Sequence, residues 1–395
     1  MKLQLALLAL VLTLPDDAPA QGRGRARDLG IPLDGVPGPL DAITDVAGVE
    51  VGHATIISGS GKLVVGKGPV RTGVTAILPR GKADLRTPAF AGWFSLNGNG
   101  EMTGTAWLEE SGLLDGPVMI TNTHSVGVVR DATIAWRIRQ GQPDRYGYFW
   151  SLPVVAETWD GHLNDINGFH VKAAHAEQAL DSAAGGAVAE GNVGGGTGMI
   201  CHEFKCGIGT SSRRLAIGGR PVTLGVLVQA NYGLRETLRI AGVPVGQHLR
   251  ADRAYQDQLP RRGAAGDTGS IIIVVATDAP LLPHQLERIA KRAGMGLARM
   301  GSYAGDGSGD IFVAFSTANG GPLSDGSFPA ATFAENGLLD PLFEATVQAT
   351  EEAIVNSLVA ARDMKGADGH FAKAIPHAEL VKLLQRYGRG GSTPR

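Results

Sequence analysis

Short apolar runs rich in β-branched residues alternate with glycine-rich turns along most of the chain. This pattern predicts strands near residues 49–57, 73–78, 118–121, 221–229, 270–276 and 311–315. Two runs, VTLGVLVQ from Val222 and SIIIVVAT from Ser270, are apolar at consecutive rather than alternate positions. Because a strand with one wet face would alternate, we expect both runs in sheets that are covered on both faces.

Three other segments repeat apolar residues at helical spacing. Behind Pro283, the apolar positions 286, 289, 290, 293 and 297 favour a helix after the strand that begins at 270. A longer helix is expected from Asp340 as N-cap, with Pro341 in the first turn, to about Met364, and a third candidate covers residues 377–387. The elements together predict an α/β fold in which buried sheets lie between helical layers.

Composition narrows the possible partners. The 395 residues are 43% hydrophobic and 19% charged, which is ordinary for a globular protein of one large domain or two closely packed layers. Beyond the N-terminus no stretch is long and apolar enough to span a bilayer. The formal net charge of −2 lacks the basic excess that phosphate neutralisation needs, so nucleic acid is not expected as a partner.

The first 20 residues have the pattern of a secretory signal peptide. Lys2 precedes an apolar run over residues 3–14, and the tripeptide at 18–20, Ala-Pro-Ala, is a small-x-small cleavage site. The run is too short for a membrane span and has no amphipathic period. We therefore expect a mature chain that begins at about residue 21 and is periplasmic or secreted.

The cysteines and glycines of residues 192–206 could form a disulfide, a metal site or an anion-binding loop. Export permits a disulfide between Cys201 and Cys206, five positions apart, without requiring one. A metal site is disfavoured, because these cysteines and His202 would have to supply all the recognisable ligands. The NVGGGTG segment could present backbone N–H groups to an anion, but neither a following Lys-Ser/Thr pair nor the dinucleotide spacing is present. We expect close backbone packing there, and no metal or organic cofactor.

The stretch GAAGDTGSIIIVVATDAP, residues 263–280, carries the most chemistry. A polar loop at 261–268 precedes Gly269, and Ser270 opens a buried strand, which is the arrangement that a self-cleaving N-terminal nucleophile enzyme needs. Ser270 Oγ would attack the Gly269 carbonyl, and hydrolysis would free an α-amine able to act as base near neutral pH. Taken alone, however, most Gly-Ser pairs that enter a strand are turn residues.

Three histidines offer a rival arrangement of the Ser-His-acid kind. His124, His162 and His202 supply candidate bases, but the chain has no GxSxG turn to carry the matching nucleophile. We therefore interpret these histidines as structural or surface residues.

Seven motifs, in the same order over residues 40–365, resemble the L-aminopeptidase/D-esterase family, which also contains the β-peptidyl aminopeptidases. They are ITDVAGVEVGH, NGNGEMTG, PVVAETWDGHLND, NVGGGTGMICHEFKCGIGTSSR, LVQANYG, GSIIIVVATDAPL and GSGDIFVAF. The resemblance implies a four-layer αββα sandwich, similar to N-terminal-nucleophile hydrolases but with its own connectivity. It also implies autocleavage between Gly269 and Ser270, which would leave chains of residues 21–269 and 270–395 associated in one domain.

The resemblance places catalytic roles on matching positions. Ser270 corresponds to the nucleophile, and Ser308 and Asp310 to the pair that hydrogen-bonds around the nucleophile and its α-amine. Many relatives have Glu at position 310, so the reach of Asp310 is shorter. Asn231 matches a residue that helps to hold the oxyanion, where a preorganised donor contributes roughly 3 kcal/mol in the transition state.

Two further positions match the substrate site. Glu157 corresponds to the carboxylate that receives the substrate's ammonium group. Trp159 stands where some relatives have a tyrosine that assists the oxyanion, and an indole can donate through Nε1 but cannot accept or titrate, so its role is left open. Taken singly, each of these residues could be an ordinary turn, cap or loop residue. Their occurrence together in the family motifs favours a catalytic or substrate-binding role.

The expected activity is that of an exported, self-processing serine aminopeptidase. It would hydrolyse short peptides, amides or esters with a free amino end, β- or D-amino acids among them, through an acyl-enzyme on Ser270. The alternatives are an acyltransferase similar to ornithine acetyltransferases, which use threonine, and a processed protein that binds without catalysis. The resemblance also suggests a homo-oligomer, a tetramer of processed pairs.

Overall fold

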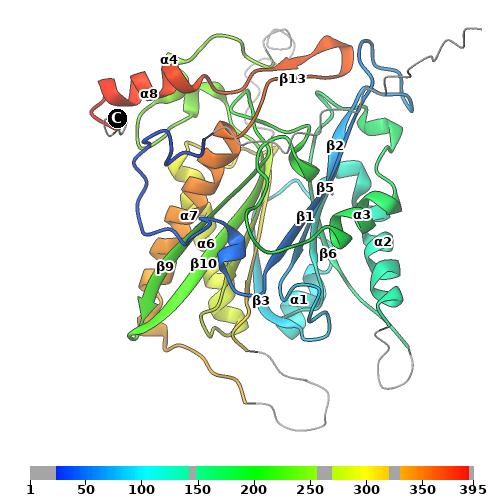
Figure 1. The fold of residues 1–395 in the computed structure, drawn as a ribbon, viewed down its shortest axis with the longest axis vertical. Coiled ribbons are helices and arrows are strands. Elements are labelled where there is room, and N and C mark those ends of the chain that lie inside the picture. The colour runs from blue at the N-terminus through cyan, green and yellow to red at the C-terminus, as the bar shows by residue number, and fades with distance from the viewer. Residues whose placement is uncertain (1–23, 142–147, 256–268, 320–329, 391–395) are drawn as a thin grey trace, which may run out of the picture.

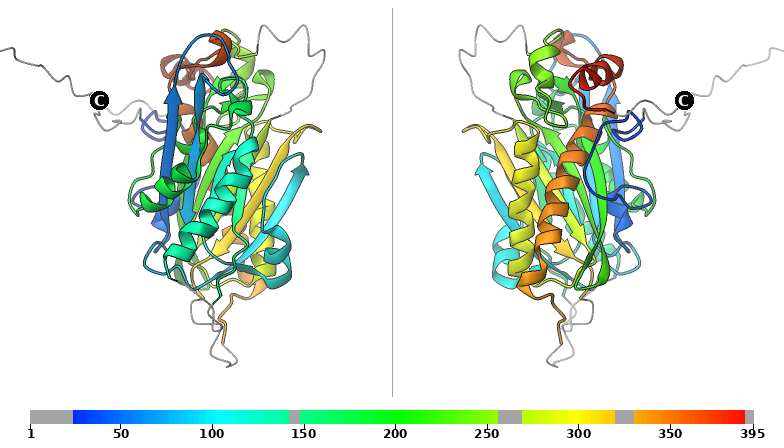
Figure 2. Two further views of the ribbon diagram at one scale, coloured as in Figure 1. Left: turned by 90° about the vertical axis from the view of Figure 1, so that its right-hand side faces the viewer. Right: turned by 90° about the vertical axis from the view of Figure 1, so that its left-hand side faces the viewer.

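In the computed structural model, which describes residues 24–141, 148–255, 269–319 and 330–390, two β-sheets lie face to face with helices outside each (Figures 1 and 2). The four-stranded sheet has the order β1 (Glu50–Ser58), β2 (Val70–Leu78), β5 (Val118–Asn122) and β6 (Val154–Thr158). The six-stranded sheet has the order β4 (Leu113–Leu114), β3 (Ala89–Gly98), β12 (Gly309–Ser316), β11 (Ser270–Thr277), β10 (Arg220–Asn231) and β9 (Ile208–Ile217).

Helices complete the two outer layers. The four-stranded sheet is covered by α2 (Val126–Arg139) and α3 (Ala173–Asp181), and the six-stranded sheet by α6 (Pro283–Arg299) and α7 (Asp340–Val359), as the two side views show (Figure 2). The remaining helices are short or peripheral: α1 (Thr105–Ser111), α4 (Val245–His248) and α8 (His377–Arg386). The expected four-layer αββα sandwich is therefore confirmed.

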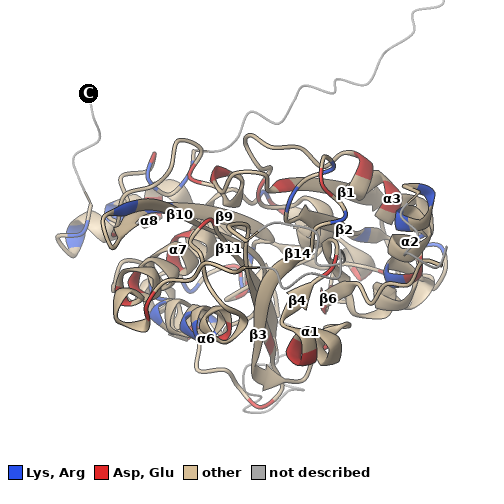
Figure 3. Ribbon diagram, turned by 90° about the horizontal axis from the view of Figure 1, so that it is seen from below, with Lys and Arg blue, Asp and Glu red and all other residues tan. Residues whose placement is uncertain are grey.

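Each interface between layers has its own apolar core. Alternate side chains of β11 face opposite sides: Ile272 and Val274 belong to the core between the sheets, whereas Ile271 and Ile273 pack toward α6 and α7. A third core joins the four-stranded sheet to α2 and α3. Seen from below, the acidic and basic residues gather mainly on the helices and connecting loops around the sheets (Figure 3). The consecutive apolar run that starts at Ser270 is thus explained by burial on both faces.

Most of the predicted elements are present at nearly the expected positions, with one correction. The long helix ends at Val359 rather than near Met364, and its N-cap is Leu339 rather than Asp340. Asn192 explains the early end, because its side chain donates to Arg362 O (2.8 Å) and accepts from Arg362 N–H (3.1 Å), which ties this backbone outside the helix. Met364 instead opens the two-residue strand β13 (Met364–Lys365), which pairs with β14 (Phe371–Ala372).

Strand pairing brings distant segments together at one edge of the six-stranded sheet. β10 and β11 are antiparallel, with Asn231 opposite Ser270, whereas β11 and β12 are parallel, with Ile271 opposite Asp310. The end of β10 and the starts of β11 and β12 therefore share that edge. Gln229 links this edge to the other sheet, because its Nε2 donates to Thr121 O and Thr158 Oγ1, both at 2.9 Å.

The proposed signal peptide and the loop at 261–268 fall outside the described residues. Among the residues that the structure does describe, no helix combines the length and the hydropathy that a bilayer crossing requires.

Candidate active site

Ser270 lies at the shared edge of the six-stranded sheet, as the first residue of β11, and is 7% exposed. Its Oγ accepts a hydrogen bond from the Gly309 N–H at 3.1 Å. Because Gly309 opens the neighbouring parallel strand, the backbone itself fixes the hydroxyl oxygen of Ser270 beside the start of β12.

Ser308 and Asp310 flank that glycine and are both buried. The Ser308 hydroxyl donates to Asp310 Oδ2 at 2.8 Å, and Asn97 Nδ2 donates to Ser308 Oγ at 3.0 Å. Asn97 is opposite Asp310 in the pairing of β3 with β12, immediately beside a β-bulge. Sequence reasoning found the pair 308/310 but assigned no role to Asn97, although it begins the quoted NGNGEMTG motif.

Asn231 is the last residue of β10 and is also buried. Its Oδ1 accepts from the Ile200 N–H at 2.9 Å, and its Nδ2 donates to the Trp159 carbonyl oxygen at 2.8 Å. These two bonds define which end of the amide is the donor. The donor nitrogen keeps a second N–H, so Asn231 has the donor capacity that an oxyanion would need.

Trp159 contributes to this arrangement through its backbone rather than through its indole. The side chain is 41% exposed and its ring lies against Gly161, where a Cβ atom would come within 2.6 Å of the ring. The indole of Trp159 is therefore placed to line the edge of the site, and the backbone carbonyl of Trp159 orients Asn231.

Glu157, near the end of β6, brings a carboxylate from the four-stranded sheet and is 4% exposed. Its Oε1 accepts from the Glu101 N–H at 3.0 Å and its Oε2 from the Thr123 hydroxyl. Burial raises the pKa of Glu157, and the two hydrogen bonds oppose that shift. The sequence did not reveal the role of Thr123, which lies 34 residues upstream in another element.

Glycines allow the acid and the serine to approach each other. A Cβ atom at Gly100 would lie 3.2 Å from Gly309 Cα and 3.3 Å from Glu157 Oε1, so this residue separates the carboxylate from the backbone that holds Ser270. At Gly309 a Cβ would overlap Asn99 O, and at Gly269 it would overlap Asn231 O and Tyr232 Cα. Side chains are therefore excluded at both positions beside the serine.

The three histidines of the rival arrangement have partners elsewhere. His202 is fully buried and its Nδ1 contacts Leu234 O at 2.9 Å, and burial lowers its pKa to about 4. The His162 ring stacks on His370 with centroids 4.2 Å apart, and His124 stacks on Phe169. These contacts agree with the interpretation of the three side chains as structural or surface residues.

Asp160, the next acidic residue after Glu157, organises the loop beyond β6. Its side chain accepts from Asn164 Nδ2 at 3.0 Å and Asn122 Nδ2 at 3.2 Å. Burial raises its pKa to about 6. Because both of its carboxylate oxygens accept hydrogen bonds from neighbouring amide side chains, Asp160 stabilises the loop that carries Trp159.

The glycine-rich segment packs backbone against backbone, as expected. Gly194 N–H donates to Thr55 Oγ1 at 2.8 Å and Gly195 N–H to Thr75 Oγ1 at 3.1 Å, so these amides are used inside the protein. Cys201 and Cys206 form a disulfide across the hairpin of β7 (Ile200–Cys201) and β8 (Phe204–Lys205). Within the described ranges, no group of three or more His, Cys, Asp or Glu side chains is placed to hold a metal ion.

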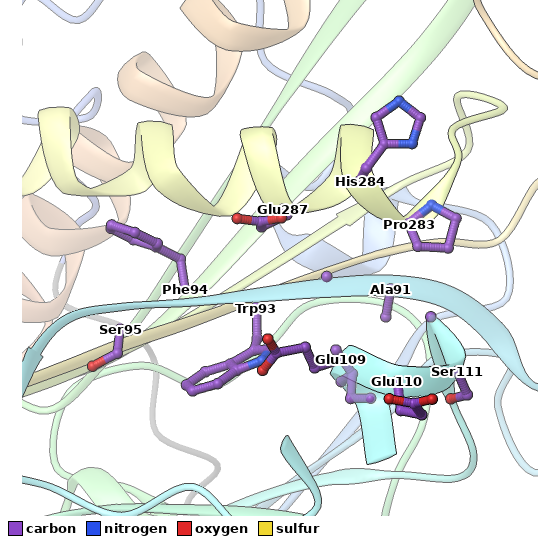
Figure 4. A pocket seen from close by; sticks show the side chains of 13 residues that line it. Ala91, Trp93, Phe94, Ser95, Glu109, Glu110, Ser111, Pro283, His284 and Glu287 are labelled. Carbon is purple, nitrogen blue, oxygen red and sulfur yellow. The ribbon is translucent and has the colours of Figure 1, made fainter. Parts of the chain in front are cut away.

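A separate hollow of about 570 Å³ lies over the middle of β3, between α1 and the start of α6 (Figure 4). Its lining includes Trp93, Phe94, Glu109, His284 and Glu287. None of the candidate catalytic residues lines it, so this hollow is distinct from the site at Ser270.

Two packed sheets between helical layers, with a buried serine opening a central strand, define the N-terminal-nucleophile hydrolase class of fold. The model of peptidase family S58 matches residues 41–372, and the chain belongs to that family. It is a hydrolase of the aminopeptidase type. Sequence reasoning had arrived at the same group from the motifs, and this is confirmed.

Similar proteins support the assignment over nearly the whole chain. The β-peptidyl aminopeptidase BapA of Sphingosinicella microcystinivorans is 56% identical over 391 residues, 97% of each chain. BapA of Sphingosinicella xenopeptidilytica is 48% identical over 385 residues, covering 96% of this chain and 95% of its own. The L-aminopeptidase D-Ala-esterase/amidase of Ochrobactrum anthropi, described as a variant of the Ntn hydrolase fold, superposes with a TM-score of 0.86 at 49% identity. The superposition covers 93% of this chain and 99% of that one.

Proposed function

We propose that the chain cuts itself between Gly269 and Ser270 and then works as a serine aminopeptidase with Ser270 as an N-terminal nucleophile. The observation that carries this proposal is the convergence of Ser270 with Ser308, Asp310 and Asn231 at one sheet edge. The products would be an α chain of residues 21–269 and a β chain of residues 270–395.

Self-cleavage requires only the serine, the preceding carbonyl and water. Ser270 Oγ attacks the Gly269 carbonyl carbon, the C–N bond breaks, and the acyl group moves from nitrogen to oxygen. Water then hydrolyses the ester, which leaves a carboxylate on Gly269 and a free α-amine on Ser270. The exclusion of a side chain at Gly269, where a Cβ would overlap the backbone of Asn231 and Tyr232, supports a bond held close to these groups.

The freed amine makes Ser270 both nucleophile and base for substrate hydrolysis. An α-amine has a reference pKa near 8 and can accept the hydroxyl proton at neutral pH. Asn231 donates to the oxyanion of the tetrahedral intermediate, and the leaving amine takes the proton. Water then attacks the acyl-enzyme and releases the amino acid. Asp310, which accepts from Ser308, orients the pair around the α-amine.

Glu157 gives the enzyme its preference for a free amino end. Its carboxylate is buried, accepts only two hydrogen bonds in the described structure, and lies next to Gly100 and hence near Gly309. A substrate ammonium group bound there would place the first carbonyl of the chain within reach of Ser270. Substrates are short peptides, amides and esters. Because two similar proteins are named β-peptidyl aminopeptidases, we include β-amino acids among the residues removed.

The proposal extends to the setting of the enzyme. The N-terminal 20 residues direct export, the mature protein is periplasmic or secreted, and processed pairs assemble into a homo-oligomer, a tetramer by resemblance. Catalysis needs no metal or organic cofactor.

Intact mass and N-terminal sequencing of the purified mature protein test the proposal directly. The expected result is two fragments, the smaller one beginning at Ser270, and a single inactive chain for Ser270→Ala. Ser316→Ala is the matched control, because Ser316 is also a buried serine and lies at the far end of β12. An uncut chain that retains peptidase activity would refute the mechanism. Dependence of turnover on an added acyl acceptor would instead indicate acyl transfer.

A further inference from the structure

The side chain of Lys205 is fully buried at the end of β8 and has no part in the mechanism proposed above. Its Nζ donates to three backbone carbonyls: Met199 O at 2.7 Å, Gly196 O at 3.3 Å, and Cys206 O. Three acceptors match the three donors of an ammonium group. Burial lowers the pKa of Lys205 well below its usual range, whereas the three carbonyl acceptors oppose that shift because only the protonated form can donate to all three. A buried cation is costly, so its retention here calls for a specific use.

One of these carbonyls belongs to the peptide group that holds Asn231. The carbonyl oxygen of Met199 and the N–H of Ile200 are the two ends of a single planar peptide unit. Lys205 Nζ contacts the oxygen at 2.7 Å, and the N–H donates to Asn231 Oδ1 at 2.9 Å. The orientation of this plane therefore helps to hold the Asn231 amide, together with the bond from Asn231 Nδ2 to Trp159 O at 2.8 Å.

Among the described residues, one further hydrogen bond reaches that carbonyl. The Met199 oxygen also accepts from the Cys206 N–H, but at a longer 3.3 Å. On the chain side, the Met199 N–H donates to Gly196 O at a long 3.3 Å, and Gly198 passes close to Arg71 O, which a Cβ atom there would overlap. Lys205 provides the shorter of the two hydrogen bonds to this carbonyl, and it is charge-assisted.

We propose that Lys205 is a positioning residue that acts through the Met199–Ile200 peptide on Asn231. The ammonium group locks the peptide plane, the Ile200 N–H locks Asn231 Oδ1, and the Asn231 Nδ2 donor is thereby aimed at the oxyanion. The same chain of hydrogen bonds polarises the Asn231 amide toward stronger donation, because hydrogen bonds in series reinforce one another. The inference rests on the role proposed above for Asn231.

A purely structural role for Lys205 predicts different kinetics. If Lys205 only held the β7–β8 hairpin together, its loss would lower stability and leave the turnover of the folded enzyme unchanged. If it acts through Asn231, the loss falls on kcat with KM little changed, because an oxyanion donor acts in the transition state.

The test replaces Lys205 in the processed enzyme by two residues whose side chains have different numbers of N–H donors. Lys205→Gln keeps two N–H donors and Lys205→Met keeps none, so kcat should fall in the order wild type, Gln, Met. The Met variant should lose about 10- to 100-fold, less than the roughly 10²–10³-fold loss expected when a whole oxyanion donor is removed. If the Met variant does not fold, the Gln variant still reports the effect with two of three bonds available.

Arg235→Met is the matched control. Arg235 is also a fully buried cation, and it donates to carbonyls of the same hairpin, His202 O at 2.8 Å and Glu203 O at 2.7 Å. In the described part of the chain its hydrogen bonds go to His202, Glu203, Leu249 and Ala251 and none goes to the Met199–Ile200 peptide. We expect a comparable drop in Tm for Arg235→Met, with kcat within twofold of wild type.

A double-mutant cycle separates this inference from the proposed function. Against an Asn231→Ala background, Lys205→Met should change kcat by less than threefold, because the donor on which it acts is already gone. Additive losses in the double variant would overturn the relay while leaving the role of Asn231 intact. A wild-type kcat for Asn231→Ala alone would instead refute the oxyanion assignment on which the relay depends.

Discussion

Replacing Glu157 by glutamine should separate substrate recognition from stability. The substitution keeps the size and both hydrogen bonds, because the amide oxygen can accept from the Glu101 N–H and the amide nitrogen can donate to Thr123 Oγ1. What it removes is the negative charge that would receive the substrate's ammonium group. The variant should therefore fold as the wild type does and bind substrate poorly.

The magnitude follows from the burial of the carboxylate. Glu157 is 4% exposed, so an ammonium group bound to it forms a largely desolvated ion pair. Hydrogen bonds to charged groups contribute about 1.5–3 kcal/mol, and breaking a buried pair costs about 3–5 kcal/mol. Since the amide oxygen still offers a neutral acceptor, we expect a loss of about 2–4 kcal/mol, or about 30- to 900-fold in kcat/KM.

Stability should change in the opposite direction. Burial raises the pKa of Glu157 above its unfolded value, so ionisation at neutral pH opposes folding. This cost is absent below the unfolded pKa and grows as pH rises through the folded pKa. Glu157→Gln should therefore raise Tm at pH 7 and leave it unchanged near pH 4, as calorimetry at the two pH values would show.

The assay compares an aminoacyl p-nitroanilide with its des-amino analogue. Wild type should strongly prefer the amine, and the preference should collapse in Glu157→Gln. Glu101→Gln is the control: its side chain is exposed while its backbone N–H still donates to position 157, so kcat/KM should change less than threefold. If the amine preference survives in Glu157→Gln, the ammonium group binds elsewhere and the reasoning is wrong.

Three further outcomes follow from individual contacts. Gly269→Ala should slow or abolish self-cleavage, as seen by intact mass over time, because the new Cβ would overlap Asn231 O and Tyr232 Cα; processing at the wild-type rate would contradict this. Asp160 has its pKa raised by burial to about 6, so its ionisation should cost roughly 3 kcal/mol of stability as pH rises from about 4 to above 6. Urea unfolding at pH 4 and 7 should show that Asp160→Asn loses this component. Replacing Cys201 and Cys206 by alanine should lower the unfolding free energy by about 2 kcal/mol, since the disulfide closes a short loop; an unchanged denaturation midpoint would argue against it.

The strands and helices that could be predicted are those in which burial produces a regular pattern of apolar residues along the sequence. β11 is apolar at every position because both faces are covered, and α6 has a clear apolar stripe behind Pro283. β3 escaped prediction because its pattern, AFAGWFSLNG, mixes buried and exposed positions without regular alternation. α2 was missed for a similar reason, since glycine, threonine and arginine interrupt its buried face. Tertiary packing determines these elements more than local preference does.

The site itself could be predicted only through whole motifs. In the structure, four of the residues predicted from the motifs lie at neighbouring strand ends of the six-stranded sheet: Ser270, Ser308, Asp310 and Asn231. Glu157 and Trp159 lie at the end of β6 in the other sheet, and the catalytic roles of all six residues stay predictions. The partners that hold them, Asn97, Thr123 and Ile200, come from elements far away in sequence, and no local spacing marks them. The bonds from Ile200, Gly309 and Glu101 use backbone N–H groups. Every residue type except proline can supply such a donor, so the residue types at these positions do not reveal the bonds.

The strand ends that meet at Ser270 would allow this serine to serve both of the proposed reactions, self-cleavage and peptide hydrolysis. In both reactions the attacked carbonyl must lie beside Ser270 Oγ, within reach of a donor from the end of β10. During the proposed self-cleavage that carbonyl would belong to Gly269, which is covalently placed. Afterwards it would belong to a substrate, which Glu157 would have to position from the opposite sheet. A defect in Asn231 should therefore impair both reactions, whereas a defect in Glu157 should impair only the second. Processing efficiency and peptidase activity measured in the same preparations of Asn231→Ala and Glu157→Gln would reveal this division, and equal loss of processing in both variants would contradict it.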